Sequence, residues 1–343
     1  MSAVLNRIEA ARLGPWLLVG LVALLCIVAL GIGQFPIGPV HIIEVLSSRL
    51  LGWPSEVPDA IVTVILQVRL PRIAAALVVG AALAAAGAAY QGLFRNPLVS
   101  PDILGVSAGA GLGAVFGIFL SLPVIGIQLL AFVFGIATVS LVYLVASAVR
   151  GREPVLVLVL AGVVLGTLAG SMISLLKVLA DPYDQLPAIT FWLLGSLAAV
   201  KLEDLATTLP ITVLGLIPLV LLRWRINVLS LGDEEAKALG IEAGGLRMVV
   251  VAAATLMTAS VVSIAGIIGW VGLIMPHMAR MVVGPNFDRL LPAAMILGAG
   301  YLLIVDTLAR SIAAVETPLG ILTAFVGAPV FLWLLARGRH GWS

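Results

Sequence analysis

A long uncharged segment, residues 73–94, constrains the fold of this chain more than any other part of the sequence. It contains no Asp, Glu, Lys or Arg, and its length is enough to cross a lipid bilayer as one helix. It is also rich in Ala and Gly, which is typical of helices that pack closely against other helices within lipid. Arg69 and Arg72 precede the segment and Arg95 follows it, so basic residues lie on both sides of the membrane, against the usual cytoplasmic bias.

Apolar segments of similar length recur along nearly the whole chain. Hydrophobic residues make up 62% of the sequence and charged residues 10%, whereas about 25% of residues are charged in soluble proteins. We therefore predict an all-α polytopic membrane protein with one transmembrane domain over residues 1–343, surrounded by membrane lipids. A transmembrane β-barrel would instead show alternating segments of about 10 residues. The net charge of +2 gives no indication of nucleic-acid binding, and the single cysteine, Cys26, cannot form an intrachain disulfide.

Ten membrane segments are predicted from these apolar runs. No cleavable signal is evident, so the first run is expected to remain as a spanning helix. The eighth is short and is interrupted by Pro276, so it is not expected to span the membrane alone. The ten segments cover residues 16–33, 66–90, 103–121, 125–149, 155–178, 205–223, 248–267, 271–283, 292–310 and 320–336.

Basic residues in the short loops set the expected orientation of the segments. Most of them fall on one side of the membrane if both chain termini are cytoplasmic. The residues on that predicted inner side are Arg95, Arg150, Arg152, Arg223, Arg225, Lys237, Arg247, Arg280, Arg289, Arg337 and Arg339. The exceptions on the predicted outer side are Arg49, Arg69, Arg72, Lys201 and Arg310.

A weak internal similarity links the two halves of the chain. The order Arg72, Pro97, Gly111 is echoed by the order Arg247, Pro276, Gly300: a basic start, a helix of small residues, a proline break and a glycine-rich helix. The two starts face opposite sides of the membrane, as an inverted repeat requires, and such repeats are common in transporters. Chance similarity between apolar segments explains the pattern equally well.

Residues 226–247 form the longest predicted cytoplasmic loop. Asp233-Glu234-Glu235 would place acidic side chains in the first turn of a short helix, and Gly240 can end that helix. An ordinary solvated turn is the simpler interpretation of this loop. It is nevertheless the only sizeable cytoplasmic element through which force could be transmitted to the membrane segments.

The energy source is predicted to lie in another polypeptide. The chain has no G-x-x-x-x-G-K-[ST] phosphate-binding loop. Apart from Lys177, His277, Asp306 and several arginines, its membrane segments hold no ionisable groups, whereas proton- or sodium-coupled carriers keep such groups near the middle of the membrane. A secondary transporter or channel acting alone is the alternative of another class. A structural scaffold would leave the cytoplasmic loop and the outer arginines without a role.

Two ionisable residues have simple structural interpretations. His277 has no Cys or carboxylate at ligand spacing, so a hydrogen-bonding role is favoured and no metal site is predicted. Asp306 precedes Arg310 by four residues, a spacing that lets the two side chains pair on one helix face.

Several short motifs occur together in a characteristic order. They are Arg69-Leu70-Pro71-Arg72, Gln91 with Arg95-Asn96-Pro97-Leu98, Pro101 with Leu104-Gly105, Gly272-Leu273-Ile274-Met275-Pro276-His277 with Arg280, Asp306 with Arg310, and Gly327-Ala328-Pro329 with Phe331. Over nearly its whole length the chain resembles the FecCD, or type II, permeases of ATP-binding-cassette (ABC) importers, which include the cobalamin-importer permease.

This resemblance implies a multi-pass permease of a bacterial or archaeal cell membrane that is not an enzyme and holds no cofactor. It also implies a second permease subunit, in a homodimer or a pair of related chains, with ten helices in each. Two cytoplasmic ATP-binding subunits would carry ATP and Mg, and a periplasmic or lipoprotein binding protein would deliver the cargo.

The resemblance assigns three roles to residues of this chain. Arg69, Arg72 and Arg310 match outward-facing arginines that receive acidic residues of the binding protein, since Arg forks bind carboxylates bidentately. The simpler interpretation of each arginine is snorkelling to lipid headgroups. Asn96 and Leu98 match a loop that closes the cytoplasmic end of the pathway. The residues that match the helices coupled to the ATPase are Leu231, Gly232, Ala236, Leu239 and Gly240.

The expected cargo is a metal chelate such as an iron siderophore, haem or cobalamin. Two departures from the family pattern bear on it. Residues 314–318 keep the Glu and the second Pro of a family motif that reads Pro-x-Glu-Leu-Pro. The outer segment 180–196 is more similar to a branch that includes molybdate and tungstate permeases. The same kind of importer carrying molybdate or tungstate is therefore the alternative.

Overall fold

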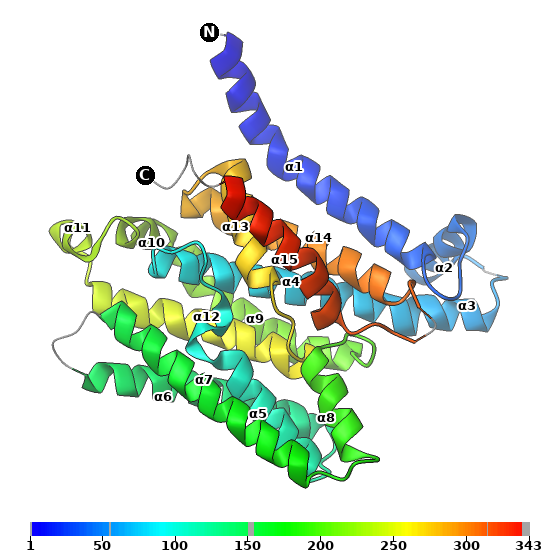
Figure 1. The fold of residues 1–343 in the computed structure, drawn as a ribbon. Helices are drawn as coiled ribbons and strands as arrows, with labels where there is room; N and C mark the ends of the chain where they lie inside the picture. The colour runs from blue at the N-terminus through cyan, green and yellow to red at the C-terminus, as the bar shows by residue number, and fades with distance from the viewer. Residues whose placement is uncertain (1, 55, 150–153, 314, 338–343) are drawn as a thin grey trace.

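The computed structural model describes residues 2–54, 56–149, 154–313 and 315–337. Throughout this part of the chain the regular elements are helices, as predicted (Figure 1). Arg150, Arg152 and Arg339, which entered the prediction of orientation, lie outside the described residues. The elements are α1 (Ser2–Gly31), α2 (Pro39–Leu51), α3 (Asp59–Thr63), the π-helix η1 (Val64–Arg69), α4 (Leu70–Leu93), the 3-10 helix η2 (Pro101–Leu104), α5 (Val106–Phe119), α6 (Val124–Ala148), α7 (Pro154–Leu179), α8 (Gln185–Leu194), α9 (Leu202–Leu221), α10 (Arg223–Leu229), α11 (Asp233–Ala238), α12 (Ala243–Ala265), α13 (Val271–Val283), α14 (Phe287–Ala309) and α15 (Leu319–Arg337).

Each of the ten predicted membrane segments overlaps one of these helices over most of its length. The corresponding helices are α1, α4, α5, α6, α7, α9, α12, α13, α14 and α15. Within the described residues, six helices are long and apolar enough to cross a membrane; the longest is the continuous run from α3 to α4, Asp59–Leu93. The short helix α13 contains Pro276, in agreement with the prediction that this segment does not span alone. The structure adds α8, an apolar helix of 10 residues within the predicted outer segment.

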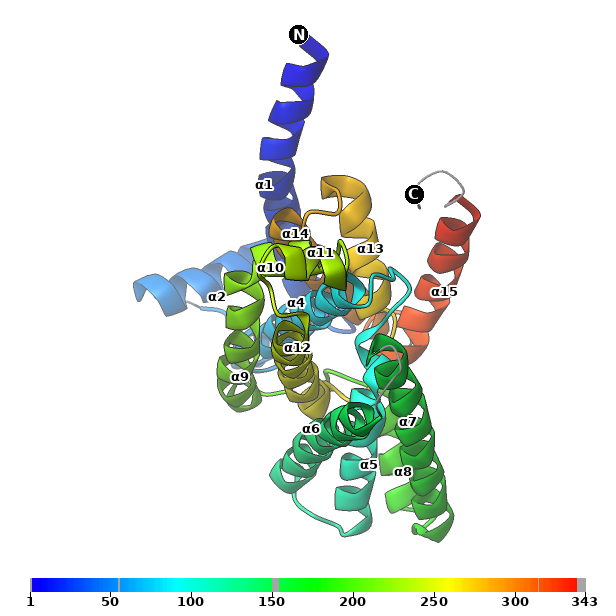
Figure 2. The same cartoon turned by 90° about the vertical axis from the view of Figure 1, so that its left-hand side faces the viewer.

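Helix α4 lies at the centre of the fold. It packs against α12, α13 and α14, while α5 packs against α6 and α7 in a neighbouring group (Figure 2). Its alanines are almost completely buried because their small side chains let the neighbouring backbones approach closely. The Ala- and Gly-rich segment 73–94 is therefore a helix-packing element, as its composition predicted.

Two glycines of α4 make this close packing possible. A Cβ atom built on Gly80 would lie 2.2 Å from the carbonyl oxygen of Gly298 in α14. A Cβ on Gly87 would lie only 1.8 Å from the carbonyl oxygen of Gly272 in α13. Both obstructing atoms belong to helix backbones, so no side-chain movement can relieve the clash. The positions of α13 and α14 therefore depend on glycine in α4.

The molecule has two distinct ends. Helices α10 and α11 lie at one end, and α2 and α3 lie at the other; the start of α1 and the end of α15 point away from the α2–α3 end (Figure 1). Helix α4 begins beside α3 and ends beside α10, whereas α12 begins directly after α11. The two segments that start at Arg72 and Arg247 therefore begin at opposite ends, which is the arrangement expected for an inverted repeat.

Candidate functional site

Arg72 is the centre of a buried ion-pair cluster at the α3 end of the molecule. Its Nε donates to Asp306 Oδ1 at 2.7 Å, and its two terminal nitrogens donate to the carboxylate of Glu316 at 2.6 and 3.0 Å. Glu316 also accepts a hydrogen bond from the Ser196 hydroxyl at 3.2 Å. Because Arg72 is only 6% exposed, these two carboxylates compensate a guanidinium that has lost its water. The cluster joins α4, α14 and the segments that precede α9 and α15.

Arg69 and Arg310 complete this outer cluster. Arg69 donates to the carbonyl oxygens of Leu30 and Phe35, so the end of α1 is held against η1. Arg310 donates to the carbonyl oxygen of Ala29, and its Nε lies 3.8 Å from Asp306 Oδ2. The outer cluster, defined here as Arg69, Arg72, Asp306, Arg310 and Glu316, thus combines three cations with two carboxylates.

The three predicted docking arginines are buried within the chain. Arg69, Arg72 and Arg310 are 4%, 6% and 9% exposed, and each is engaged by other groups of the chain. Their partners come from distant segments, which hold the guanidinium groups inside the fold. The predicted pair between Asp306 and Arg310 exists, but the shorter contact of Asp306 is with Arg72. Docking of a binding protein stays a prediction for these residues.

The predicted gate loop follows directly from the end of α4. The amide of Asn96 donates to Gln91 O at 3.2 Å and the amide of Arg95 to Gly92 O at 3.3 Å, the pattern of a Schellman helix end. In this motif the residue in the left-handed conformation is usually glycine, whereas here it is Arg95, with φ of 49°. The helix therefore ends in a conformation that costs free energy for a residue with a Cβ atom.

Asn96 and Leu98 lie on the exposed side of this loop. Asn96 Oδ1 accepts a hydrogen bond from the Leu98 amide at 2.9 Å, and the Val99 amide donates to Asn96 O at 3.3 Å. Asn followed by Pro97 suits such a tight turn because the proline ring presets the backbone angle of the second position. Both gate residues are exposed in this chain. Their role in closing a pathway stays a prediction.

Helix α11 lies in the predicted coupling loop and has a defined start and end. Its first residue, Asp233, receives two hydrogen bonds of 3.0 Å from the Arg247 guanidinium, which ties it to α12. At its end, the amides of Gly240 and Ile241 donate to Lys237 O and Ala236 O at 3.0 and 2.9 Å, a second Schellman motif. Gly240 has φ of 76°, so the prediction that glycine ends this helix is confirmed.

The five predicted coupling residues divide into two groups. Leu231 and Leu239 are 65% and 56% exposed, so they offer apolar contacts to another subunit. Ala236 is completely buried and packs inside the permease chain instead. Gly232 and Gly240 flank the helix with positive φ angles of 147° and 76°. The two leucines form the accessible part of this surface, while the other three residues shape it.

The gate loop and α11 lie next to each other. A Cβ atom built on Gly232 would lie 2.1 Å from Glu235 Oε2 and 3.6 Å from Arg95 Nη1. The side chain of Glu235 therefore folds back over the start of its own helix, and the guanidinium of Arg95 reaches the same place. A displacement of α11 would reach the gate loop directly through these atoms.

The sequence did not reveal two polar contacts that the structure shows. Glu316 was noted as part of a motif, but its pairing with Arg72 could not be read from residues so far apart. Asp102 in η2 accepts a hydrogen bond from Ser107, at the start of α5. Burial raises the pKa of the Asp102 carboxyl, and the hydrogen bond from Ser107 opposes this change. The sequence feature that could have indicated this pair is the position of Asp102, an acidic residue in the short turn before the Gly-rich helix α5.

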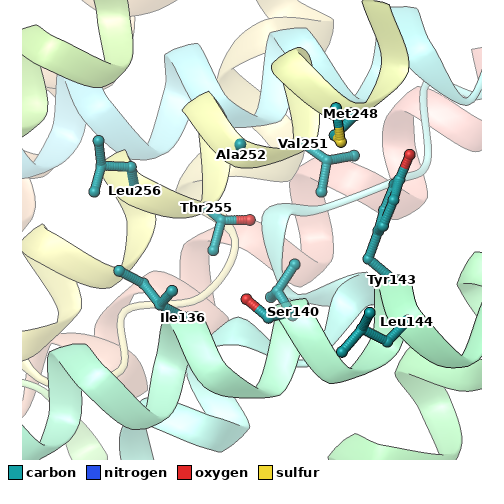
Figure 3. A pocket seen from close by; sticks show the side chains of 10 residues that line it. Ile136, Ser140, Tyr143, Leu144, Met248, Val251, Ala252, Thr255 and Leu256 are labelled. Carbon is teal, nitrogen blue, oxygen red and sulfur yellow. The ribbon is translucent and has the colours of Figure 1, made fainter. Parts of the chain in front are cut away.

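An apolar groove between α6 and α12 is separate from these sites. It has a volume of about 500 Å³, and side chains of the two helices face each other across it (Figure 3). Ser140, Tyr143 and Thr255 supply its few polar atoms. None of the predicted site residues lines this groove, and its apolar walls suit contact with lipid.

Comparisons with known proteins identify the family to which this chain belongs. The FecCD transport family matches residues 21–337. The chain belongs to this family. It is 42% identical over 330 residues to the molybdate import system permease protein MolB of Haemophilus influenzae, with 95% of this chain and 97% of that protein covered. It is 35% identical over 340 residues to the hemin transport system permease protein HmuU of Yersinia pestis, with 96% and 98% covered.

A solved structure has the same fold. It is an inward-facing conformation of a metal-chelate type ABC transporter. Its chain is 40% identical in sequence to this one, and the two superpose with a TM-score of 0.85. The similarity covers 94% of this chain and 98% of that chain. The protein is therefore a multi-pass permease subunit of a metal-chelate type ABC importer of prokaryotes. It is not itself an ATPase, since ATP is hydrolysed by the partner subunits of such importers.

Proposed function

We propose that this permease receives a metal chelate from a binding protein on its outer side and releases it into the cytoplasm when its ATPase partners bind ATP. The observation that carries this proposal is the contact between α11 and the gate loop at the α10–α11 end. Leu231 and Leu239 would contact the ATPase, and the displacement of α11 would pass through Gly232 and Arg95 to Asn96 and Leu98. Opening and closing then follow from a nucleotide-driven population shift.

The coupling role of α11 can be tested at Gly240. Replacing Gly240 with valine puts a β-branched residue at a φ of 76°, which costs about 1–2 kcal/mol and distorts the end of α11. The space around Gly240 is open, so the fold should otherwise be unaffected. We expect ATP hydrolysis by the reconstituted complex to continue while cargo uptake per ATP falls severalfold, measured in proteoliposomes.

Gly244→Val is the matched control for this substitution. Gly244 lies in the first turn of α12, four residues beyond Gly240, and an added Cβ atom would meet only Glu242 Oε1 at 3.8 Å. This variant should keep both hydrolysis and uptake. If Gly240→Val is as well coupled as Gly244→Val, α11 does not transmit the force.

We further propose that two copies of the permease pair through their exposed apolar helices, with both termini in the cytoplasm of a bacterial or archaeal cell. A recess of about 590 Å³ between α8 and α15 is lined by Leu194, Gly320, Ala324, Phe325 and Ala328, among others. Phe325 is largely exposed, and the spacing of Gly320, Ala324 and Ala328 lays small residues along one face of α15. Such a face suits close approach of another helix in lipid.

The cargo proposal has one specific competitor. Import of molybdate or tungstate is favoured by the near full-length similarity to MolB, a permease protein of a molybdate import system. The haem and cobalamin permeases among the relatives support a chelate instead. The deciding experiment is metal analysis and calorimetry on the binding protein that stimulates ATP hydrolysis by the reconstituted importer. Bound iron chelate, haem or cobalamin supports the proposal, and bound molybdenum or tungsten overturns it in favour of the oxyanion.

We also propose that the outer cluster meets carboxylates of the binding protein. Its three arginines outnumber its two acids, so the cluster retains attraction for an approaching carboxylate despite its burial. An incoming carboxylate would have to replace part of the internal contacts, for example those of Arg69 with the carbonyl oxygens of Leu30 and Phe35. Docking would then loosen the hold of η1 on the end of α1.

A further inference from the structure

A polar recess lies beside the gate loop at the α10–α11 end. Its volume is about 230 Å³, and its walls come from the end of α4, the gate loop, α10, α13 and the start of α14. Its polar and charged wall residues are Gln91, Arg95, Asn96, Asn227, Ser230 and Arg280. No carboxylate lines the recess itself, although the carboxylate of Glu235 lies close to Arg95 beside Gly232.

Two other arginines at this end of the molecule have carboxylate partners. Arg223 pairs with Asp288 at 2.9 Å and Arg247 with Asp233 at 3.0 Å. Among the described residues, neither Arg95 nor Arg280 has a carboxylate within 4.0 Å. Arg280 is nevertheless half-buried, so its guanidinium has lost part of its water without gaining a partner. A bound anion would supply the missing partner for both cations.

Gln91 forms part of the wall of the recess and is held in place by the backbone. Its Nε2 donates to the carbonyl oxygens of Val99 and Leu273 at 3.3 and 3.0 Å, which fixes the orientation of the amide. Its Oε1 is closed off from solvent and therefore does not open into the recess. The attraction for an occupant comes from the two arginines.

The backbone of Arg95 is consistent with such a role. A left-handed conformation is retained at Arg95 although glycine would adopt it without strain. Strained residues of this kind are concentrated where a side chain is needed for binding or switching. Here the strain keeps a guanidinium at the mouth of the recess and beside Gly232.

We propose that this recess binds hydrogen phosphate or a phosphate monoester. Arg95 and Arg280 would bind the anionic oxygens through charge-assisted hydrogen bonds. The Nδ2 group of Asn96 supplies a further donor, because the Oδ1 of that residue is already used by the Leu98 amide. The ligand would hold the gate loop against α13, and this inference does not depend on which cargo the importer carries.

Calorimetry on the full-length permease in maltoside micelles tests the proposal without lipid phosphate or ATPase sites. Titration with inorganic phosphate should give saturable binding that is weakened about tenfold by Arg280→Gln, as expected for the loss of one charge-assisted contact. Arg225→Gln is the matched control, since Arg225 is an exposed arginine of α10 that does not line the recess. The affinity of this variant for phosphate should equal that of the unchanged protein. Arg95→Gly should also weaken binding without lowering the thermal midpoint, because it removes backbone strain.

A further ligand identifies the source of the phosphate group. Phosphatidic acid added to the micelles tests a lipid monoester; if it competes with inorganic phosphate, the same site accepts either source, and the proposal holds. Equal phosphate affinity of the unchanged chain and Arg280→Gln would overturn the proposal. So would an absence of phosphate binding combined with weaker ATPase assembly in Arg280→Gln, because the recess would then belong to a subunit interface.

Discussion

Replacing Arg72 with alanine is expected to lower the free energy of unfolding of this permease by about 3–5 kcal/mol. The substitution leaves Asp306 and Glu316 without the guanidinium that contacts both at 2.6–3.0 Å. Asp306 is completely buried, so its charge cannot be compensated by water. The measurement is the thermal midpoint of the purified permease in detergent, together with the yield of monodisperse protein.

Two companion variants separate the structural role of Arg72 from docking. Arg225→Ala removes an exposed arginine and should leave the thermal midpoint unchanged. Arg72→Met combined with Asp306→Asn and Glu316→Gln removes Arg72 together with both of its carboxylate partners and leaves Arg69 and Arg310 in place, so it should recover much of the stability. This triple variant should still fail to bind the binding protein if the outer cluster is its docking site. A thermal midpoint of Arg72→Ala equal to that of the unchanged protein would show that the cluster does not stabilise the fold.

The structure changes how charge reversal of Arg69 and Arg72 should be interpreted. If these arginines served docking alone, reversal would abolish docking and leave insertion into the membrane intact. An acidic residue at position 72 would face two carboxylates at the centre of the outer cluster, so the fold itself should suffer. Arg69→Gln disturbs the fold less, because the side-chain amide of glutamine can still donate to the carbonyl oxygens of Leu30 and Phe35. It should weaken binding-protein affinity with little change in stability.

Replacing Gly87 with valine is expected to prevent α13 from packing on α4. The first side-chain carbon alone would lie 1.8 Å from Gly272 O and 2.9 Å from Gly272 Cα, far inside contact distance. Since both atoms are backbone, the helices must separate, and we expect a loss of more than about 4 kcal/mol. Size-exclusion chromatography of the fluorescently tagged permease should show little folded protein.

Gly20→Val is the control for this experiment. Gly20 lies in α1, and an added Cβ atom would meet nothing within 4 Å. This variant should elute as the unchanged protein does and keep its thermal midpoint. A folded Gly87→Val protein with normal stability would contradict the view that glycine sets the distance between α4 and α13.

The sequence predicted correctly those structural features that depend on residues close together in the chain. The absence of charge over residues 73–94 predicted a membrane helix, because the backbone of such a segment must satisfy its own hydrogen bonds in lipid. Gly240 predicted the end of α11, since few other residues adopt a φ of 76°. The pair of Asp306 and Arg310 was also visible, because residues four apart meet on one helix face.

Contacts between distant segments could not be inferred in the same way. Arg72 and Asp306 are separated by 234 residues, and Arg72 and Glu316 by 244. Their pairing depends on how α4, α14 and the segment before α15 come together. The same holds for Ala236, whose burial follows from the packing of α11 rather than from its own short helix.

By itself, the sequence determined that this protein is a helical membrane permease of the FecCD family, and it located the ten membrane segments, most of them to within about five residues of the helix ends. These properties follow from local hydrophobicity, helix-end chemistry and ordered motifs. Only the tertiary structure decided that Arg69, Arg72 and Arg310 are buried within the chain. It also decided that Arg95 lies between the gate loop and α11, beside a recess without carboxylates. The physical reason is that the environment of a charge depends on the groups packed around it, and those groups come from helices far apart in the sequence.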